Sequence, residues 1–140
     1  MKTIKNKSGF TLLEIIIVII IVGVLASLAL PRFFATVEFS RAQEALSAIA
    51  AVRGGMERCY VGKGKTYTGC GTANIDTGDP LKGQPNAHFS ISVSAAGAAG
   101  YVITGTRNAV EGGTVNDLVV ITQTTGGITR SGTGAFGGIN

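Results

Sequence analysis

The 140-residue sequence has few of the side chains that build metal and catalytic centres. It contains two cysteines and one histidine, His88, so a zinc site would lack its four ligands at usable spacing. No serine or cysteine nucleophile pattern and no paired acid accompanies His88, which we expect to be a surface residue and not a catalyst. The sequence therefore predicts a protein that is not an enzyme and needs no cofactor.

Charged residues are also few, at 14% of the chain, and the formal net charge is +4. Lys2, Lys5 and Lys7 carry three of the four excess positive charges and precede a long apolar run. Without them, nine basic side chains stand against eight acidic ones. Beyond the apolar run there is no cluster of Lys and Arg interleaved with aromatic residues, so we expect no direct binding of nucleic acid.

The apolar residues crowd into the first third of the chain. From Phe10 to Leu30, 21 residues carry a single charged side chain, Glu14. As a helix rising about 1.5 Å per residue, this run would cross roughly 30 Å of hydrocarbon. The basic residues before it belong on the cytoplasmic side by the positive-inside rule. We therefore predict one membrane span with a cytoplasmic amino end.

Helical periodicity continues beyond the apolar run. Apolar residues recur there at steps of three and four, with charged residues between them. They are Ala42, Ala45, Leu46, Ile49, Val52 and Met56. We predict one long helix from about Phe10 to about Arg58, apolar all round in its first half and amphipathic in its second. Pro31 is expected to kink or loosen this helix, and Gly54 and Gly55 to weaken its end.

The rest of the chain predicts an irregular loop followed by strands. Residues 59–88 are rich in Gly, Thr, Asn, Asp and Pro and have no sustained period. Residues 89–94 alternate between apolar residues and serine, which is typical of a strand. Residues 101–106 and 118–124 predict two more strands, and Gly126–Gly127 predicts a tight hairpin turn into a short fourth.

The predicted fold class is α+β. The apolar face of a small antiparallel sheet needs a cover, and the amphipathic half of the helix offers the matching stripe. We therefore expect a long amino-terminal helix packed on a sheet of three or four strands. Residues 131–140 are Gly-rich and are expected to form a loose tail.

The two cysteines, Cys59 and Cys70, lie in the part of the chain that would follow the membrane span. That side is oxidising, so we predict a disulfide between them. Closing so short a loop stabilises the fold by about 2–3 kcal/mol in the chain-entropy picture. Two unpaired buried thiols are the alternative.

Two short patterns in the loop resemble ligand sites. Residues 62–66, Gly-Lys-Gly-Lys-Thr, end like a phosphate-binding loop, but Cys59 occupies the position of the first glycine and the stretch follows a helix. Asp76 and Asp79 lie in one turn and could ligate calcium, although Asp and Gly so close to Pro80 are more often turn chemistry. We expect no metal, with this aspartate pair as the alternative.

The junction between the basic start and the apolar run, residues 5–14, reads Lys-Asn-Lys-Ser-Gly-Phe-Thr-Leu-Leu-Glu. It closely resembles the type IV prepilin family. That family has a short basic leader ending in glycine, here Gly9, then an aromatic residue, here Phe10. A glutamate follows as the fifth residue from that aromatic one, here Glu14, and an apolar helix comes next. Pro31 also falls where such helices commonly carry a proline.

The resemblance implies that a prepilin peptidase in the inner membrane cuts between Gly9 and Phe10 and methylates the new amino group of Phe10. A carboxylate in an apolar helix costs on the order of 3 kcal/mol on insertion scales, so Glu14 needs a partner. In a filament, the ammonium of one subunit can pair with Glu14 of a neighbour and set the axial register.

The resemblance further implies a subunit stored in inner-membrane lipid and polymerised with itself and related pilins. An inner-membrane assembly platform driven by a cytoplasmic ATPase would build it into a cell-surface pilus or a periplasmic pseudopilus. The chain then divides into a leader (1–9), a transmembrane and filament-core helix half (10–30), an amphipathic helix half (31–58), a disulfide-pinned loop (59–88) and a sheet with a Gly-rich tail (89–140).

Within the family, the sequence leaves open a major pilin, a minor pilin and a pseudopilin of a type II secretion system. The cysteine loop favours a pilin, and Glu14 favours a subunit that adds throughout a filament over one that only caps its tip. Whether the filament serves adhesion, motility or DNA uptake also stays open.

Three other classes of protein remain as alternatives. An ordinary secretory signal also has a basic start and an apolar centre, and residues 27–29, Ser-Leu-Ala, would pass as its cleavage site. The length of the apolar run and Glu14 near its start oppose this. A single-pass anchor carrying a periplasmic binding module would let Glu14 snorkel to the interface. A secreted enzyme is the third.

Overall fold

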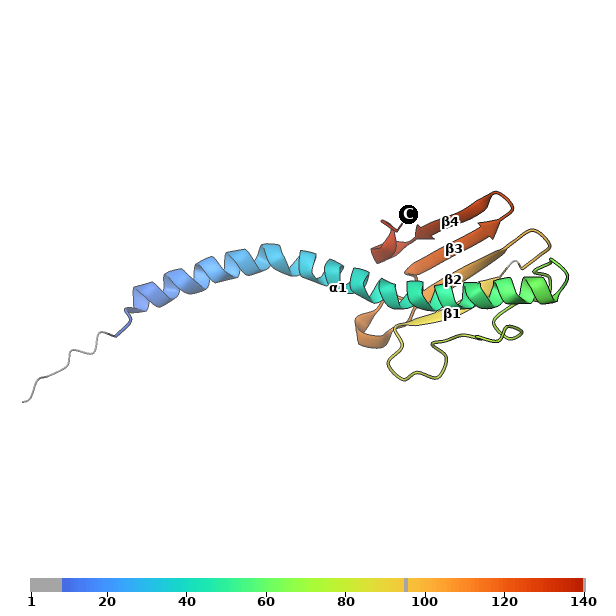
Figure 1. The fold of residues 1–140 in the computed structure, drawn as a ribbon. Helices are drawn as coiled ribbons and strands as arrows, with labels where there is room; N and C mark the ends of the chain where they lie inside the picture. Colours follow the sequence, from blue (N-terminus) through green and yellow to red (C-terminus); the bar gives the residue numbers. More distant parts are fainter. Residues whose placement is uncertain (1–8, 95, 140) are drawn as a thin grey trace, which may run out of the picture. The chain divides into compact units, whose positions relative to one another are not determined.

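The computed structural model describes residues 9–94 and 96–139 and confirms the α+β class (Figure 1). One long helix precedes four strands and two short 3-10 helices. These are α1 (Leu12–Gly62), β1 (Phe89–Ser94), β2 (Tyr101–Arg107), η1 (Val110–Gly112), β3 (Leu118–Thr124), β4 (Gly127–Gly132) and η2 (Gly134–Phe136). The chain divides into two compact units, Met1–Thr36 and Val37–Asn140. We call the second unit the head.

The helix α1 ends one turn beyond the predicted end near Arg58. Gly64 adopts a left-handed φ of 73°, which a residue without Cβ takes at little cost. The N–H of Lys65 donates to the carbonyl oxygen of Tyr60 at 2.9 Å, and the N–H of Gly64 donates to that of Val61 at 3.4 Å. This pair of bonds is the Schellman ending of a helix. Gly64, and not the earlier pair of glycines, therefore stops α1.

Gly54 and Gly55 lie inside α1 but have different surroundings. A Cβ on Gly55 would lie 2.5 Å from Oγ1 of Thr77 and 3.2 Å from Cδ1 of Ile75, because the connecting loop approaches the helix backbone there. A Cβ on Gly54 would meet only the flexible end of Arg58, at 3.4 Å. Gly55 is therefore needed for packing, whereas Gly54 is not.

We expect Gly54→Ala and Gly55→Ala to change stability in opposite directions. Gly54→Ala should raise the free energy of unfolding by up to about 1 kcal/mol, because alanine favours a helix interior. Gly55→Ala should lower it by about 1–3 kcal/mol, because Thr77 must leave a packed site. Urea unfolding of the detergent-solubilised chain, followed by near-ultraviolet circular dichroism of its three tyrosines, measures both changes. Two stabilising changes would mean that the loop does not pack on Gly55.

The four strands form one antiparallel sheet in the order β1-β2-β3-β4. β1 and β3 have the predicted bounds, and β2 is one residue longer than predicted. Thr124 pairs with Gly127, so the residues that turn between β3 and β4 are Thr125 and Gly126. The turn predicted at Gly126–Gly127 was therefore wrong by one residue.

The core of the head lies between α1 and one face of the sheet (Figure 1). The buried residues of α1 recur at the predicted steps of three and four: Ala42, Ala45, Ala48, Ile49, Val52, Gly55 and Met56. Leu46, which was also predicted to face the core, is only partly buried. Alternate residues of β1, β2 and β3 face them: Phe89, Ile91, Tyr101, Ile103, Val119 and Ile121. A Cβ on Gly105 of β2 would lie 3.3 Å from Cβ of Ala45, so the absence of a side chain there lets α1 pack close to β2.

The end of the chain is not the loose tail predicted for residues 131–140, of which the last lies outside the described residues. The side chain of Phe136 is fully buried, and its ring centroid lies 5.4 Å from that of Phe89. The hydroxyl of Thr133 accepts a hydrogen bond from the N–H of Leu118 at 3.0 Å. One aromatic side chain and one hydroxyl thus fix a segment that its glycines had suggested was loose.

Candidate assembly site

The first unit carries an exposed apolar helix. Among the described residues, α1 is the one helix long and apolar enough to cross a membrane; its most apolar 18-residue window has a mean hydropathy of 3.0 and is 0% buried. Over residues 12–30 the exposed fractions of the large apolar residues run from 43% at Ile16 to 77% at Leu12. Apolar surface left in water costs about 25 cal/mol per Å², so this helix requires a cover of lipid or protein.

The predicted processing and assembly residues Gly9, Phe10 and Glu14 all lie at the start of this helix. Gly9 and Phe10 precede its first residue, and a Cβ on Gly9 would meet no atom of the described residues within 4 Å. The side chain of Phe10 is 81% exposed. Every ion pair found among the described residues lies in the head. The carboxylate of Glu14 therefore has no ionic partner among the described residues. Residues 1–8, which are the rest of the predicted leader, lie outside the described residues.

Sequence reasoning missed the residue that caps the helix, Thr11. Its hydroxyl accepts a hydrogen bond from the N–H of Glu14 at 3.3 Å. A threonine followed three residues later by glutamate, before an apolar run, is a known start signal for helices, so the cap could have been predicted from the sequence. Because α1 begins just after Thr11, Glu14 lies in its first turn, where the helix dipole favours a negative charge. Pro31, the predicted kink, lies inside α1.

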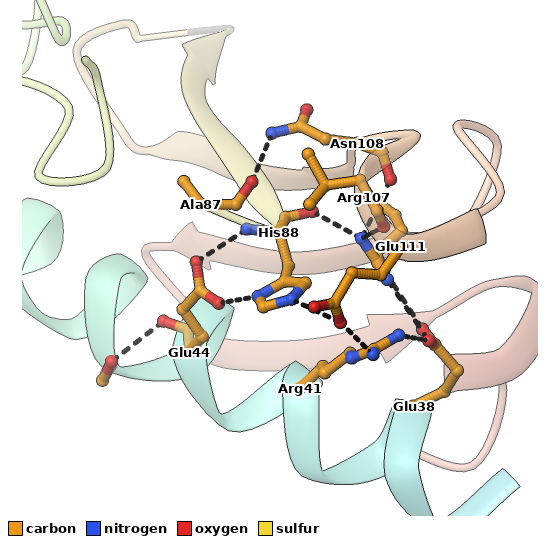
Figure 2. A network of polar contacts seen from close by, with 10 residues as sticks. Glu38, Arg41, Glu44, Ala87, His88, Arg107, Asn108 and Glu111 are labelled. Carbon is orange, nitrogen blue, oxygen red and sulfur yellow. Dashed lines mark hydrogen bonds and ion pairs between the residues drawn. The ribbon is translucent and has the colours of Figure 1, made fainter. Parts of the chain in front are cut away.

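The head holds a connected network of charged side chains where α1 enters it (Figure 2). Arg107 is 0% exposed, and its guanidinium donates to both carboxylate oxygens of Glu38, at 3.1 and 3.2 Å. It also donates to the carbonyl oxygens of His88, Asn108 and Val110, at 3.2, 2.9 and 3.1 Å. The hydrogen bonds from Arg107 hold the pKa of the Glu38 carboxyl below its usual range. A buried cation is thus fully paired, which ties α1 to the end of β2.

His88 is more enclosed than the surface residue predicted from the sequence. Its side chain is 21% exposed and lies between two carboxylates, with Nδ1 2.7 Å from Glu44 and Nε2 3.4 Å from Glu111. Its backbone N–H also donates to Glu44, at 3.0 Å. Figure 2 shows the imidazole joining helix α1 to the segment that contains η1. The two glutamates are distant from His88 in sequence, so no local pattern could have predicted this contact.

The predicted disulfide is present at the other end of the head. It joins Cys59 of α1 to Cys70 of the loop, with Cα atoms 6.1 Å apart. Beside it, the hydroxyls of Tyr67 and Tyr101 donate to the carboxylate of Glu57, at 3.0 and 3.1 Å. Burial and the hydrogen bond to Glu57 raise the pKa of Tyr67 to about 12. The disulfide and this hydroxyl–carboxylate cluster together fix the loop on the last turns of α1.

Replacing both cysteines by serine should lower the free energy of unfolding of the head by about 2–3 kcal/mol, because the loop regains conformational freedom in the unfolded state. Thermal unfolding of the detergent-solubilised chain, with and without a reductant, measures the loss. The reductant should destabilise the unsubstituted chain and leave Cys59→Ser/Cys70→Ser unchanged. An equal effect on both proteins would mean that the bond does not stabilise the head.

The carboxylates of Asp76 and Asp79, the alternative calcium ligands, are each bound by protein donors. Asp76 accepts two hydrogen bonds from the guanidinium of Arg58, at 2.8 and 2.9 Å. Asp79 accepts from the backbone N–H groups of Leu81 and Ile91, at 2.9 and 3.3 Å. Over residues 9–94 and 96–139, no three side chains of the metal-binding types gather as a metal site. These contacts anchor the loop to α1 and β1.

Comparison with known proteins adds relatives for both parts of the chain. The family described as the prokaryotic N-terminal methylation motif matches residues 4–30. Fimbrial protein EcpC of Eikenella corrodens is 33% identical over 79% of this chain and 77% of its own length. Type IV major fimbrial protein FimA of Dichelobacter nodosus is 31% identical over 74% of this chain and 64% of its own length.

A second group of relatives is similar over a shorter stretch. Type II secretion system core protein G of Escherichia coli strain K12 is 42% identical over 41% of this chain and 39% of its own length. The chain therefore spans about two fifths of the length of that relative. No solved structure matches.

Proposed function

Because this chain belongs to the type IV pilin family, we propose that it is the precursor of a pilus subunit that is cut, methylated and polymerised through its amino-terminal helix. The observation that carries this proposal is an exposed apolar helix whose first turn holds a lone carboxylate, Glu14. The proposed role is structural, with no catalytic step of its own.

We place the processing site at the bond between Gly9 and Phe10. Both residues precede the helix cap at Thr11, and a Cβ on Gly9 would meet no atom of the described residues within 4 Å, so this bond is open to a peptidase. A prepilin peptidase in the inner membrane cuts this bond and methylates the amino group of Phe10. The cut creates an ammonium one turn away from Glu14, where none existed in the precursor.

Assembly moves the apolar helix from membrane lipid into a bundle of like helices. The surroundings of its side chains stay apolar, so the transfer changes the free energy of burial little. In the bundle, the ammonium of Phe10 in one subunit pairs with Glu14 of a neighbour and fixes the axial register. The partners are other copies and related pilins, the peptidase, and an inner-membrane platform driven by a cytoplasmic ATPase.

We favour a pilus subunit over a type II secretion pseudopilin because of where the similarity lies. The fimbrial relative EcpC aligns with 79% of this chain, which includes much of the head, whereas core protein G aligns with only 41%. The subunit then passes from the inner membrane to a filament at the cell surface. A pseudopilin, confined to a periplasmic filament, is the second candidate.

Intact mass and amino-terminal sequencing of protein sheared from the cell surface tests the proposal. We expect a chain that begins at methylated Phe10. A chain that begins at Leu30 would mean an ordinary signal peptide, and an uncut Met1 in the membrane fraction would mean an anchored module. Methylated Phe10 found in the cell envelope but never in the sheared fraction would favour the pseudopilin.

A further inference from the structure

The two ends of the head carry opposite charges. The unit Val37–Asn140 contains seven acidic and eight basic side chains, so it is nearly neutral as a whole. Where α1 enters the head lies the acidic end, which we define as Glu44, Glu111, Val115 and Asp117. Where α1 stops lies the basic end, which we define as Val61, Lys63 and Lys65. About twenty residues of α1 separate these ends, which is roughly 30 Å along a helix. Figure 1 shows this part of α1 running along the sheet.

The acidic end has more carboxylates than cations. The buried Arg107 is paired with Glu38, and Arg41 pairs with Glu38 and Glu111 (Figure 2). Glu44, which contacts His88, and Asp117, whose backbone oxygen accepts from the N–H of Arg107 at 3.0 Å, add two more carboxylates at this end. Four carboxylates therefore stand against two guanidinium groups here. The side chain of Glu111 is 60% exposed. The end thus presents negative charge to solvent.

The basic end has free positive charge. Lys63 and Lys65 are exposed in the turn that closes α1, and neither makes an ion pair with any of the described residues. The carboxylate of Glu57 is bound by tyrosine hydroxyls, and that of Asp76 by Arg58. These nearby acids are therefore already occupied.

Each end also presents one large apolar side chain beside its charges. Val61 is 77% exposed at the basic end, and Val115 is 56% exposed at the acidic end. An apolar centre with a charged rim is the usual composition of a protein interface. The two ends therefore carry opposite charges, and each has an exposed valine beside its charged side chains.

The backbone adds a further observation that links the two ends. Lys65 and Glu111, with φ of 67° and 52°, are the two non-glycine residues with left-handed φ among residues 9–94 and 96–139. This conformation costs an L-residue about 1–2 kcal/mol, which glycine would avoid. The chain therefore keeps one charged side chain at each end despite a local cost.

We propose that the basic end of one copy docks on the acidic end of the next, with Val61 and Val115 at the centre of the contact. This proposal rests on the proposed function and identifies the surfaces of the head through which copies contact one another in the filament. Two different patches on one molecule form a heterologous contact, which repeats without closing and produces a helical filament. Exposed charge pairs contribute orientation more than affinity, so the helices hold the filament together and set its axial register, while this contact orients neighbouring heads.

Charge reversal in the full chain tests the contact, in cells that express no other copy of it. Lys63→Glu/Lys65→Glu should lower the yield of sheared filaments by about tenfold or more, which corresponds to about 1.4 kcal/mol. Adding Asp117→Lys to the same chain, which keeps the pair of Glu111 with Arg41, should restore part of the yield, because one pair re-forms with opposite signs. The rescue separates loss of contact from loss of folding. Lys82→Glu/Arg130→Glu reverses two exposed charges outside both ends and should change nothing.

A cysteine pair gives a direct readout. Filaments of Val61→Cys/Val115→Cys should yield a ladder of linked copies on oxidation, whereas each single substitution should yield none. Unchanged yield after Lys63→Glu/Lys65→Glu, together with the absence of a ladder from intact filaments, would overturn the contact and leave the proposed function standing. Failure of the unsubstituted chain to form filaments would overturn the proposed function as well.

Discussion

Glu38→Gln should lower the free energy of unfolding of the head by about 3 kcal/mol, because it leaves the buried guanidinium of Arg107 without a countercharge. Arg107 is 0% exposed, and Glu38 supplies its carboxylate partner. The glutamine oxygen can still accept one hydrogen bond, but it carries no charge. Urea unfolding of the detergent-solubilised chain, monitored by tyrosine circular dichroism, measures the loss.

Glu44→Gln provides the matched control. Glu44 lies two turns further along the same helix and contacts His88, whose side chain is 21% exposed and reached by water. Replacing the Glu44 carboxylate should lower the free energy of unfolding by about 1 kcal/mol, which is typical of one hydrogen bond. Equal losses in the two variants would show that the burial of Arg107 does not set the cost.

The same pair makes the head sensitive to acid. The hydrogen bonds from Arg107 lower the pKa of Glu38 from its ordinary value of 4.5, so the unfolded chain takes up this proton at a higher pH than the folded one. The stabilisation is therefore present above pH 4.5 and is lost as the pH falls through the lowered pKa. The free energy of unfolding should decline with acid in the unsubstituted chain, and part of that decline should be absent from Glu38→Gln.

The sequence predicted those elements whose pattern repeats over several residues. Phe89, Ile91 and Val93 alternate with serines, so the bounds of β1 could be read directly from the period of two. The end of α1 could not be read in this way. Gly54 and Gly55 suggested an end that the helix does not have. Gly55 lies inside the helix because Thr77 of the loop packs on it, and the sequence alone does not show that contact.

The charged network escaped prediction for a related reason. Glu38, Arg41 and Glu44 recur along one side of α1, a spacing equally typical of charges that face water. Their partners Arg107 and Glu111 are about seventy residues away from Glu38 and Arg41. Such a contact depends on the register of a sheet and has no local signature. The motif of Gly9, Phe10 and Glu14, by contrast, is contiguous and could be recognised from the sequence alone.

Glu14→Ala should leave cleavage and methylation intact but nearly abolish filaments. A carboxylate or an ammonium left unpaired in apolar surroundings costs on the order of 3 kcal/mol, which corresponds to about a hundredfold loss of assembly. Alanine removes the carboxylate of the incoming subunit, which would pair with the Phe10 ammonium of the subunit already in the filament. The methylated subunit should therefore accumulate in the inner membrane, and comparing the membrane and sheared fractions measures the shift.

Two further variants separate the charge of Glu14 from the geometry of the helix start. Glu14→Gln keeps the size of the side chain but not its charge, so it should fail as completely as Glu14→Ala. Thr11→Ala removes the cap of α1 at a cost of about 1 kcal/mol and should still assemble. A subunit that only caps the tip has no preceding ammonium to neutralise, so a carboxylate at this position favours one that adds throughout the filament. Normal filament yield from Glu14→Ala would therefore refute both the pairing and this role.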